Sequence, residues 1–147
     1  MLTITIENRK VVIENLQGLA GAAPQIITNV LKRSAVGVHR DAFDKLSGPA
    51  ANTGGYPVPV VTGNLRRLLN WLAPGDSKDG FSAGDRQSVV YNSAEYARAV
   101  HQGTKQHSKY GARPYLTDAF DAFNRSGRIE QIANEELDKA LRKHNLN

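Results

Sequence analysis

The longest regular pattern in the sequence is an apolar stripe that predicts one long helix. Between positions 24 and 46, apolar residues recur at spacings of three and four: Ile26, Ile27, Val30, Leu31, Ala35, Val38, Ala42, Phe43 and Leu46. This spacing is typical of an amphipathic helix. Pro24 suits a first helical turn, and Ser47-Gly48-Pro49 stops the pattern. We therefore expect a helix from Pro24 to Leu46, with a short helix at Leu16–Ala20 as an option before it.

Three further helices are expected in the second half of the sequence. Ala94–Gln102 reads as a short helix that Gly103 ends. Pro114 starts the next one, whose apolar face carries Leu116, Ala119, Phe120 and Phe123. The last runs over Arg128–Lys143, where apolar residues again share a face. Its acidic residues come before its basic ones, an order that complements the helix dipole.

Short strands are predicted where the apolar period changes to two. Apolar residues at 2, 4 and 6 alternate with threonines, so Leu2–Ile6 is a predicted strand and Lys10–Ile13 an option for a second. Gly80–Ala83 and Gln87–Tyr91 flank Gly84-Asp85, which supplies turn residues, so we expect them to form a hairpin.

The segment after the long helix has no single interpretation. Ser47–Thr62 contains three glycines and three prolines without a regular period, which predicts a loop. Thr62 can cap a short helix that continues through Leu68–Leu72, or those residues form a strand. Together the elements predict one α+β domain over residues 1–147, with a small, mostly antiparallel sheet packed against the long N-terminal helix and a C-terminal helix.

Candidate catalytic and metal-binding groups are badly spaced. His101 and His107 are separated by a helix-ending glycine, and no acidic residue follows closely to complete a metal site. His39, Asp41 and Asp44 do not face one another on a helix. Cysteine is absent, and neither a nucleophile elbow nor a phosphate-binding loop occurs. We therefore expect no enzyme, no cofactor and no metal.

The positive charge is concentrated in two irregular segments. The net charge is +5, and neither Lys45–Gly75 nor Tyr96–Thr117 contains an acidic residue. The loops within them, 47–62 and 103–113, are candidate contact surfaces that we expect to order on assembly. Lys105, Lys109 and Arg113 interleave with Tyr110 and Tyr115, so a small basic protein that binds nucleic acid without specificity stays open. No membrane span or signal peptide is expected, so synthesis in the cytoplasm follows.

Three short blocks carry a resemblance to a known family. They are VVTGNLRR at 60–67, YARAVHQGT at 96–104 and ARPYL at 112–116. In this order and spacing they resemble the tail-completion family of tailed bacteriophages, also called head–tail joining, neck or minor tail component proteins. The matching positions are Thr62, Gly63, Leu65, Arg66, Tyr96, Ala97, Val100, Gly103, Thr104, Ala112, Arg113, Pro114, Leu116 and Ala119.

The chain departs from the family pattern at four positions. His101 replaces the acid that usually follows the valine, and Leu68 replaces a serine. Tyr115 stands for the usual phenylalanine, and Asp118 follows Thr117 where a proline is usual. The matched glycines, proline and apolar residues shape the backbone, so the resemblance implies a structural motif and no reaction chemistry.

The resemblance implies a structural protein of the virion of a tailed phage or prophage, made in the cytoplasm of the bacterial host. Such proteins act in tail completion or head–tail joining, assemble as rings, commonly of six copies, and meet tail-tube or connector proteins. The expected contact residues are Arg66, Arg67, Lys105, Lys109, Tyr110 and Arg113. A ring contact is head-to-tail, so we expect these residues to meet acids elsewhere on the next copy, with Asp76, Asp79 and Asp85 as candidates.

Overall fold

One long helix forms the axis along which the other elements lie. The computed structural model describes residues 9–47, 63–103 and 112–146, without the side chains of residues 9–13. The helices are α1 (Arg9–Lys45), α2 (Asn64–Arg67), α3 (Ala97–Gln102), α4 (Tyr115–Arg125) and α5 (Arg128–Lys143). The strands are β1 (Leu69–Leu72), β2 (Ser77–Lys78), β3 (Phe81–Ser82) and β4 (Val89–Asn92).

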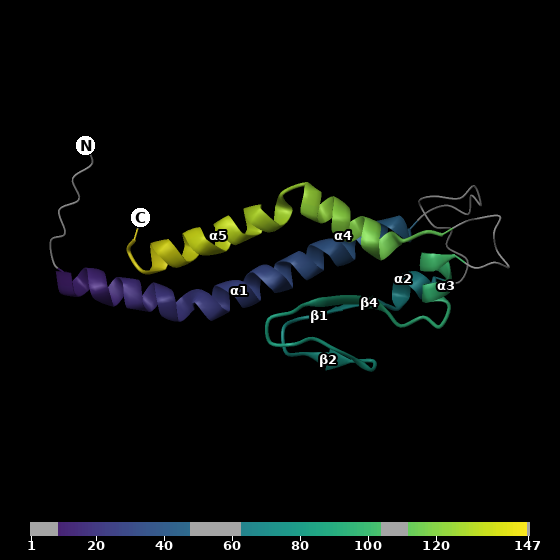
Figure 1. Ribbon diagram of the computed structural model, residues 1–147, viewed down its shortest axis with the longest axis horizontal. Helices are drawn as coiled ribbons and strands as arrows, with labels where there is room; N and C mark the ends of the chain where they lie inside the picture. The colour runs from purple at the N-terminus through teal and green to yellow at the C-terminus, as the bar shows by residue number, and fades with distance from the viewer. Residues whose placement is uncertain (1–8, 48–62, 104–111, 147) are drawn as a thin grey trace.

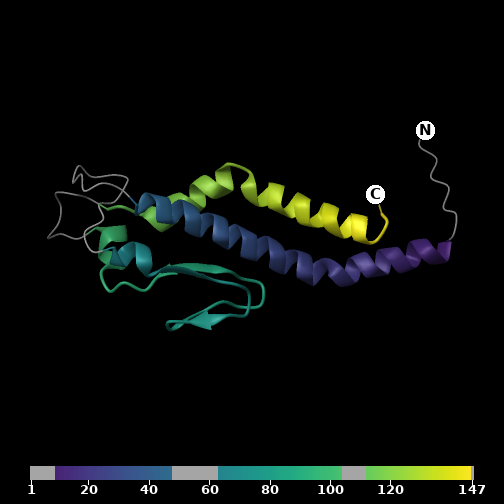
Figure 2. The ribbon, with the colours of Figure 1, turned by 180° about the vertical axis from the view of Figure 1, so that it is seen from behind.

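The predicted α+β architecture is confirmed. α4 and α5 run back along one side of α1, and the strands lie along its other side (Figure 1). Figure 2 shows the same arrangement from behind, and α1 contacts α4 and α5 in one layer and β1 and β4 in the other. The strands reach only the C-terminal half of α1, while α5 follows its N-terminal half.

α1 is longer than the sequence predicts. The predicted strand at Lys10–Ile13 is wrong because those residues belong to α1, and Leu2–Ile6 lies outside the described residues. Pro24 lies inside the helix, where a proline removes a backbone hydrogen bond and costs about 3 kcal/mol or more. Packing of α1 on the end of α5 offsets this cost. A Cβ atom on Gly18 would stand 2.6 Å from Nδ1 of His144.

Polar contacts fix how α1 and α5 lie against each other. Arg33 donates to two neighbouring carboxylates, at 2.6 Å to Oε2 of Glu135 and 2.8 Å to Oε1 of Glu136. Asn29, one turn earlier on α1, donates to Oε2 of Glu136 at 3.0 Å. Lys139 donates to Oε1 of Glu136 at 2.9 Å. A shift of either helix by one turn would break the contacts from Asn29 and Arg33, whereas the Lys139 contact lies within α5 and holds Glu136 in place.

The main core lies where α4 crosses the C-terminal half of α1 and meets β1. Its buried side chains are Val38, Ala42, Leu46, Leu69, Tyr115, Ala119 and Phe123. α4 approaches α1 closely at Gly37, where a Cβ atom would stand 2.2 Å from the ring of Phe123. The glycine is therefore a packing requirement of this helix crossing.

The strands form two separate antiparallel pairs. β4 pairs with β1, with Leu69 opposite Asn92 and Leu72 opposite Val89. β3 pairs with β2, and the turn between them is Asp79-Gly80. Both turn residues have positive φ, 54° and 80°, as a two-residue hairpin turn of the primed type requires. The sequence leaves a helix and a strand open for Leu68–Leu72, and the structure forms the strand β1 there.

The predicted hairpin between Gly80–Ala83 and Gln87–Tyr91 is wrong, since its two halves belong to different pairs. Gly84-Asp85 joins the pairs instead. A second small apolar cluster explains this arrangement, because Leu72, Ala83 and Tyr91 pack together between them. The ring of Tyr91 stacks on that of Phe81 at 4.2 Å between centroids.

Candidate functional site

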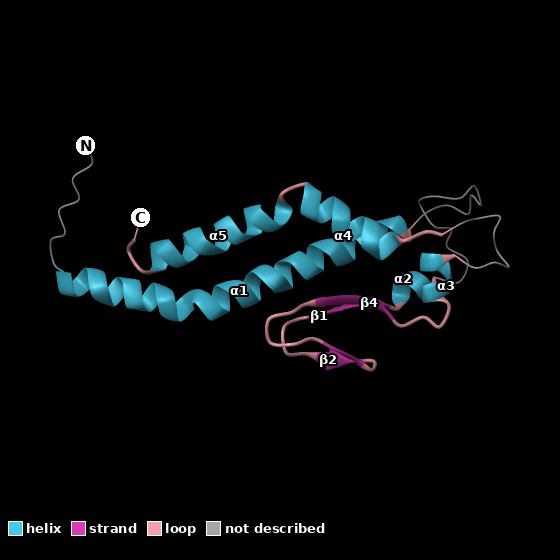
Figure 3. Cartoon of the chain, in the orientation of Figure 1, coloured by secondary structure: helices cyan, strands magenta, loops and turns pink. Residues whose placement is uncertain are grey.

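The three motif blocks, far apart in the sequence, meet at one end of the molecule. α2, α3 and the start of α4 gather beside the last turns of α1 (Figure 3). One residue from each block, Leu65, Val100 and Leu116, packs on the main core beside the buried Leu46 and Tyr115. We call this region the motif end. The residues on either side of positions 48–62 and 104–111 also lie there (Figure 1).

Hydrogen bonds hold the three blocks in place at the motif end. Nδ2 of Asn92 donates to the carbonyl of Leu65 at 2.7 Å, which joins β4 to the first block. The N–H of Arg113 donates to the carbonyl of Val100 at 3.0 Å, which joins the second block to the third. These bonds explain why residue types at separated positions belong to one motif.

Gly103 ends α3 with a positive φ of 75°, as its predicted capping role requires. A Cβ atom at this position would stand 3.1 Å from the backbone nitrogen of Ala112. The chain therefore leaves α3 and returns to α4 at the same place. A side chain at Gly103 would be opposed both by the backbone conformation and by this contact.

Tyr115 lies at the centre of the motif end with its side chain fully buried. Burial raises the pKa of Tyr115 to about 12, with a hydrogen bond to Asn92 acting in the opposite direction. The ring of His101 meets that of Tyr115 edge-on, with 5.6 Å between the ring centroids. Nε2 of His101 lies 3.2 Å from Oγ1 of Thr117. His101 is thus a packing residue against α4.

Arg113 does not occupy the surface position predicted for it. Its side chain is only 8 % exposed, so it lies within the fold of one copy. An arginine at this depth does not fit the predicted contact with an acid of another copy. The bond from its backbone to Val100 gives it a structural role instead, and Arg113→Glu would place a carboxylate in the same buried position.

Arg66 and Arg67 do reach the surface of the motif end. The guanidinium of Arg66 lies over the ring of Phe43, 5.4 Å from its centroid. Arg67 is exposed and donates to the side chain of Asn64, so α2 holds it in place. The other predicted site residues, Thr62, Thr104, Lys105, Lys109 and Tyr110, lie outside the described residues.

The acids predicted to face this basic end lie at the far end of the β1–β4 pair. Asp76 and Asp85 are exposed, and hydrogen bonds from Gly75 to Gly84 and from Ala83 to Asp76 hold their turns together. Asp79 instead accepts a hydrogen bond of 2.9 Å from the hydroxyl of Tyr91. Burial is the larger cause of the raised pKa of Tyr91, and this hydrogen bond raises it further.

The histidine and aspartate side chains considered as catalytic or metal-binding groups make structural contacts within the fold. Nε2 of His39 lies 3.1 Å from the carbonyl of Leu69, and Asp41 accepts a bond from Arg128 at 2.8 Å. In residues 9–47, 63–103 and 112–146, no three acidic or histidine side chains gather as metal ligands would. Nor does any helix in these ranges have the length and apolar character that crossing a bilayer demands.

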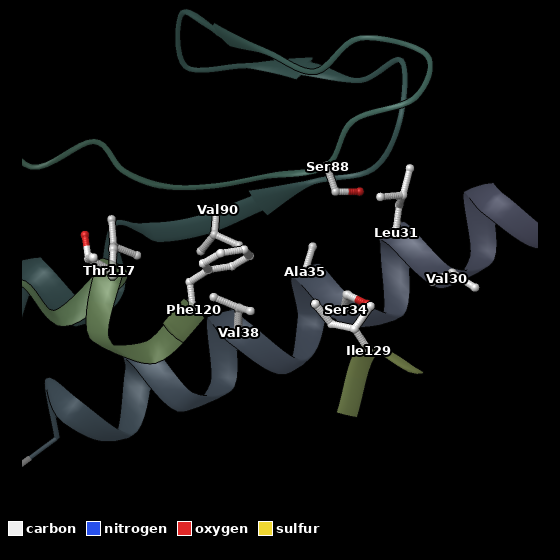
Figure 4. A pocket seen from close by; sticks show the side chains of 11 residues that line it. Val30, Leu31, Ser34, Ala35, Val38, Ser88, Val90, Thr117, Phe120 and Ile129 are labelled. Atoms are coloured by element: carbon white, nitrogen blue, oxygen red, sulfur yellow. The ribbon is translucent and has the colours of Figure 1, made fainter. Parts of the chain in front are cut away.

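Sequence reasoning missed an apolar groove of about 420 Å³ between α1, β4, α4 and the start of α5. Figure 4 shows Val90 of β4 and Phe120 of α4 facing each other across it, with Leu31, Ala35 and Val38 of α1 as its floor. Phe120 is 50 % exposed there, unusually open for so large an apolar ring. The groove residues follow the same period as the core residues, so periodicity alone could not separate them.

Comparisons of the chain with protein-family models, with curated proteins and with solved structures find no match.

Proposed function

We propose that this protein is a structural component of the virion of a tailed phage or prophage and acts in tail completion or head–tail joining as a ring. The observation that carries the proposal is the convergence of the three motif blocks at one end of the fold. Residues with no catalytic chemistry are matched there. They share one core, a backbone hydrogen bond joins the second block to the third, and the side chain of Asn92 bonds to the first. A motif of this kind preserves the shape of a contact surface.

The distribution of charge supports a head-to-tail contact between copies. Arg66 and Arg67 precede β1, and the stretch from Asp76 to Arg86, which holds three acids and two bases, follows it. The two ends of one short strand pair therefore carry opposite charge. A contact between unlike surface patches closes into a ring when the rotation from one copy to the next is a whole fraction of a full turn. The motif end of one copy would face the acidic turn of the next.

Charge reversal tests this contact. Arg67→Glu should weaken self-association by about tenfold, since it removes an attraction and adds a repulsion. Asp85→Lys should do the same, and the two changes together should restore part of the loss. Light scattering across protein concentration measures the assembly. Arg142→Glu, an exposed change at the far end of α5, is the matched control and should leave assembly unaltered.

Two further observations separate the proposal from its alternative. Genes for portal, capsid and tail-tube proteins beside the coding gene would support it. Salt-dependent binding of DNA by a protein that stays monomeric at every concentration would contradict it and favour a nucleic-acid-binding function.

A further inference from the structure

Among residues 9–47, 63–103 and 112–146, no other strand covers the outer edge of β4, and its sheet has two strands. The N–H of Ser93 donates to the carbonyl of Leu68, which fixes the hydrogen-bond pattern of the pair. Bonded and non-bonded pairs alternate in an antiparallel ladder, so Tyr91 and Val89 point their backbone groups toward β1. The backbone N–H and C=O of Val90 therefore point outward, where another strand could bond to them.

Two hollows border this edge, one on each face of β4. The apolar groove described above lies on the α1 face, and Val90 and Leu116 line it. A second hollow of about 320 Å³ is lined by the same two residues, by Val89 and Tyr91 of β4, and by a mixture of aromatic and polar side chains that includes Phe81, Asn92, Arg98, His101 and Tyr115. The open edge thus borders one apolar groove and one hollow whose lining also contains polar and charged groups.

The apolar groove also contains two hydroxyl groups without partners. Oγ of Ser34 and Oγ of Ser88 are buried and make no hydrogen bond in the part of the chain that the structure describes. Buried polar atoms in native folds are nearly always hydrogen-bonded, and leaving one unpaired costs about 1–3 kcal/mol. An incoming backbone would bring both donors and acceptors to them.

The ligand that fits this arrangement is an extended chain with apolar residues at every second position. Added to β4, it would bond to the free backbone edge and place alternate side chains in the two hollows. The sequence contains such a segment at 2–6, where Leu2, Ile4 and Ile6 alternate with two threonines. We propose that residues 2–6 of a second copy of this chain bind as an added strand along the outer edge of β4.

The segment cannot reach the groove of its own copy. The groove begins at Val30, which lies about 32 Å along α1 from Arg9 at the helical rise of 1.5 Å per residue. Leu2 is seven residues before Arg9 and extends at most about 25 Å from it. The contact is therefore between copies. The contact joins two unlike surfaces, as the contacts of a ring do. This proposal therefore rests on the proposed ring function and adds one of its contacts.

Cysteine cross-linking tests the contact directly, because the chain has no cysteine of its own. Copies that carry Ile4→Cys are mixed with copies that carry Val90→Cys and oxidised. Opposed residues of neighbouring antiparallel strands have Cα atoms about 4.5–5.5 Å apart, within the range of Cα separations that a disulfide spans. We expect linked pairs from this mixture, and several-fold fewer when Thr5→Cys replaces Ile4→Cys, since residue 5 would face the other hollow. Equal linkage from both would overturn the proposal.

A second measurement separates this contact from the ring itself. Ile4→Asp should weaken self-association by about tenfold, while Thr5→Asp should change it far less. Circular dichroism of each variant checks that the fold is retained. Normal rings from Ile4→Asp would overturn the added strand and leave the ring function standing. A wild-type chain that remains monomeric at all concentrations would overturn both.

Discussion

At the scale of single residues, Glu136 shows how one carboxylate joins two helices. It is 6 % exposed and accepts hydrogen bonds from Asn29, Arg33 and Lys139. The bond from Lys139, followed by those from Asn29 and Arg33, lowers the pKa of Glu136 despite the opposing effect of burial. The ionised form is thus the one that the folded chain stabilises.

This predicts that stability falls in acid. A carboxylate whose folded pKa is lowered contributes stability above its ordinary pKa, and the contribution is lost as the pH falls through the folded value. Urea unfolding at pH 6 and pH 3 should show wild type losing roughly 1–2 kcal/mol more than Glu136→Gln over this interval. Glu130→Gln, a control at an exposed position without an ion pair in the described ranges, should lose as much as wild type.

At the scale of elements, local signals decided some boundaries and distant contacts decided others. The last helix has the predicted bounds, Arg128–Lys143, because Gly127 precedes it with a positive φ and its stripe is regular. The start of α1 was missed because Pro24 resembles a helix start. Its true extent depends on packing of Gly18 against His144, which no local pattern encodes.

The errors in the strands and in the site have different physical causes. Asp79-Gly80 is itself a strong two-residue turn signal, and the structure forms its hairpin there and not at Gly84-Asp85, where the sequence pattern predicts it. The depth of Arg113 could not be inferred, since a charged residue in a loop gives no local sign of burial. Leu65, Val100 and Leu116, which the three motif blocks single out, all pack on the main core, as apolar residues at such positions can be expected to do.

The crossing of α1 and α4 predicts opposite effects for two glycines of the same helix. Gly37→Ala would place a methyl group in the ring of Phe123 and should destabilise the protein by about 1–3 kcal/mol. Gly21→Ala has open space around it and should stabilise by about 0.5–1 kcal/mol through helix propensity. Thermal unfolding of both variants measures the difference. Equal shifts would mean that α4 does not pack at Gly37.

At the scale of the whole molecule, the fold is long and thin. α1 has 37 residues, which corresponds to about 55 Å. The other elements lie along it in one layer on each side (Figure 1). An elongated subunit offers long lateral surfaces, which suits contacts with neighbours on two sides.

Small-angle scattering of the monomer should therefore give a maximum dimension of at least about 55 Å. The radius of gyration should clearly exceed the roughly 15 Å of a compact domain of this length. The forward scattering intensity must match one copy, so that self-association does not account for the size. A compact globule would mean that α1 does not extend as one helix.

The contact between Gly103 and Ala112 has a consequence for how such a protein can evolve. Because these two residues touch and Arg113 is bonded to Val100, the distance between α3 and α4 does not depend on how many residues connect them. Insertions and deletions between positions 103 and 112 should therefore leave the packing of these two helices unchanged, so that this stretch can vary in length over generations without cost to the fold.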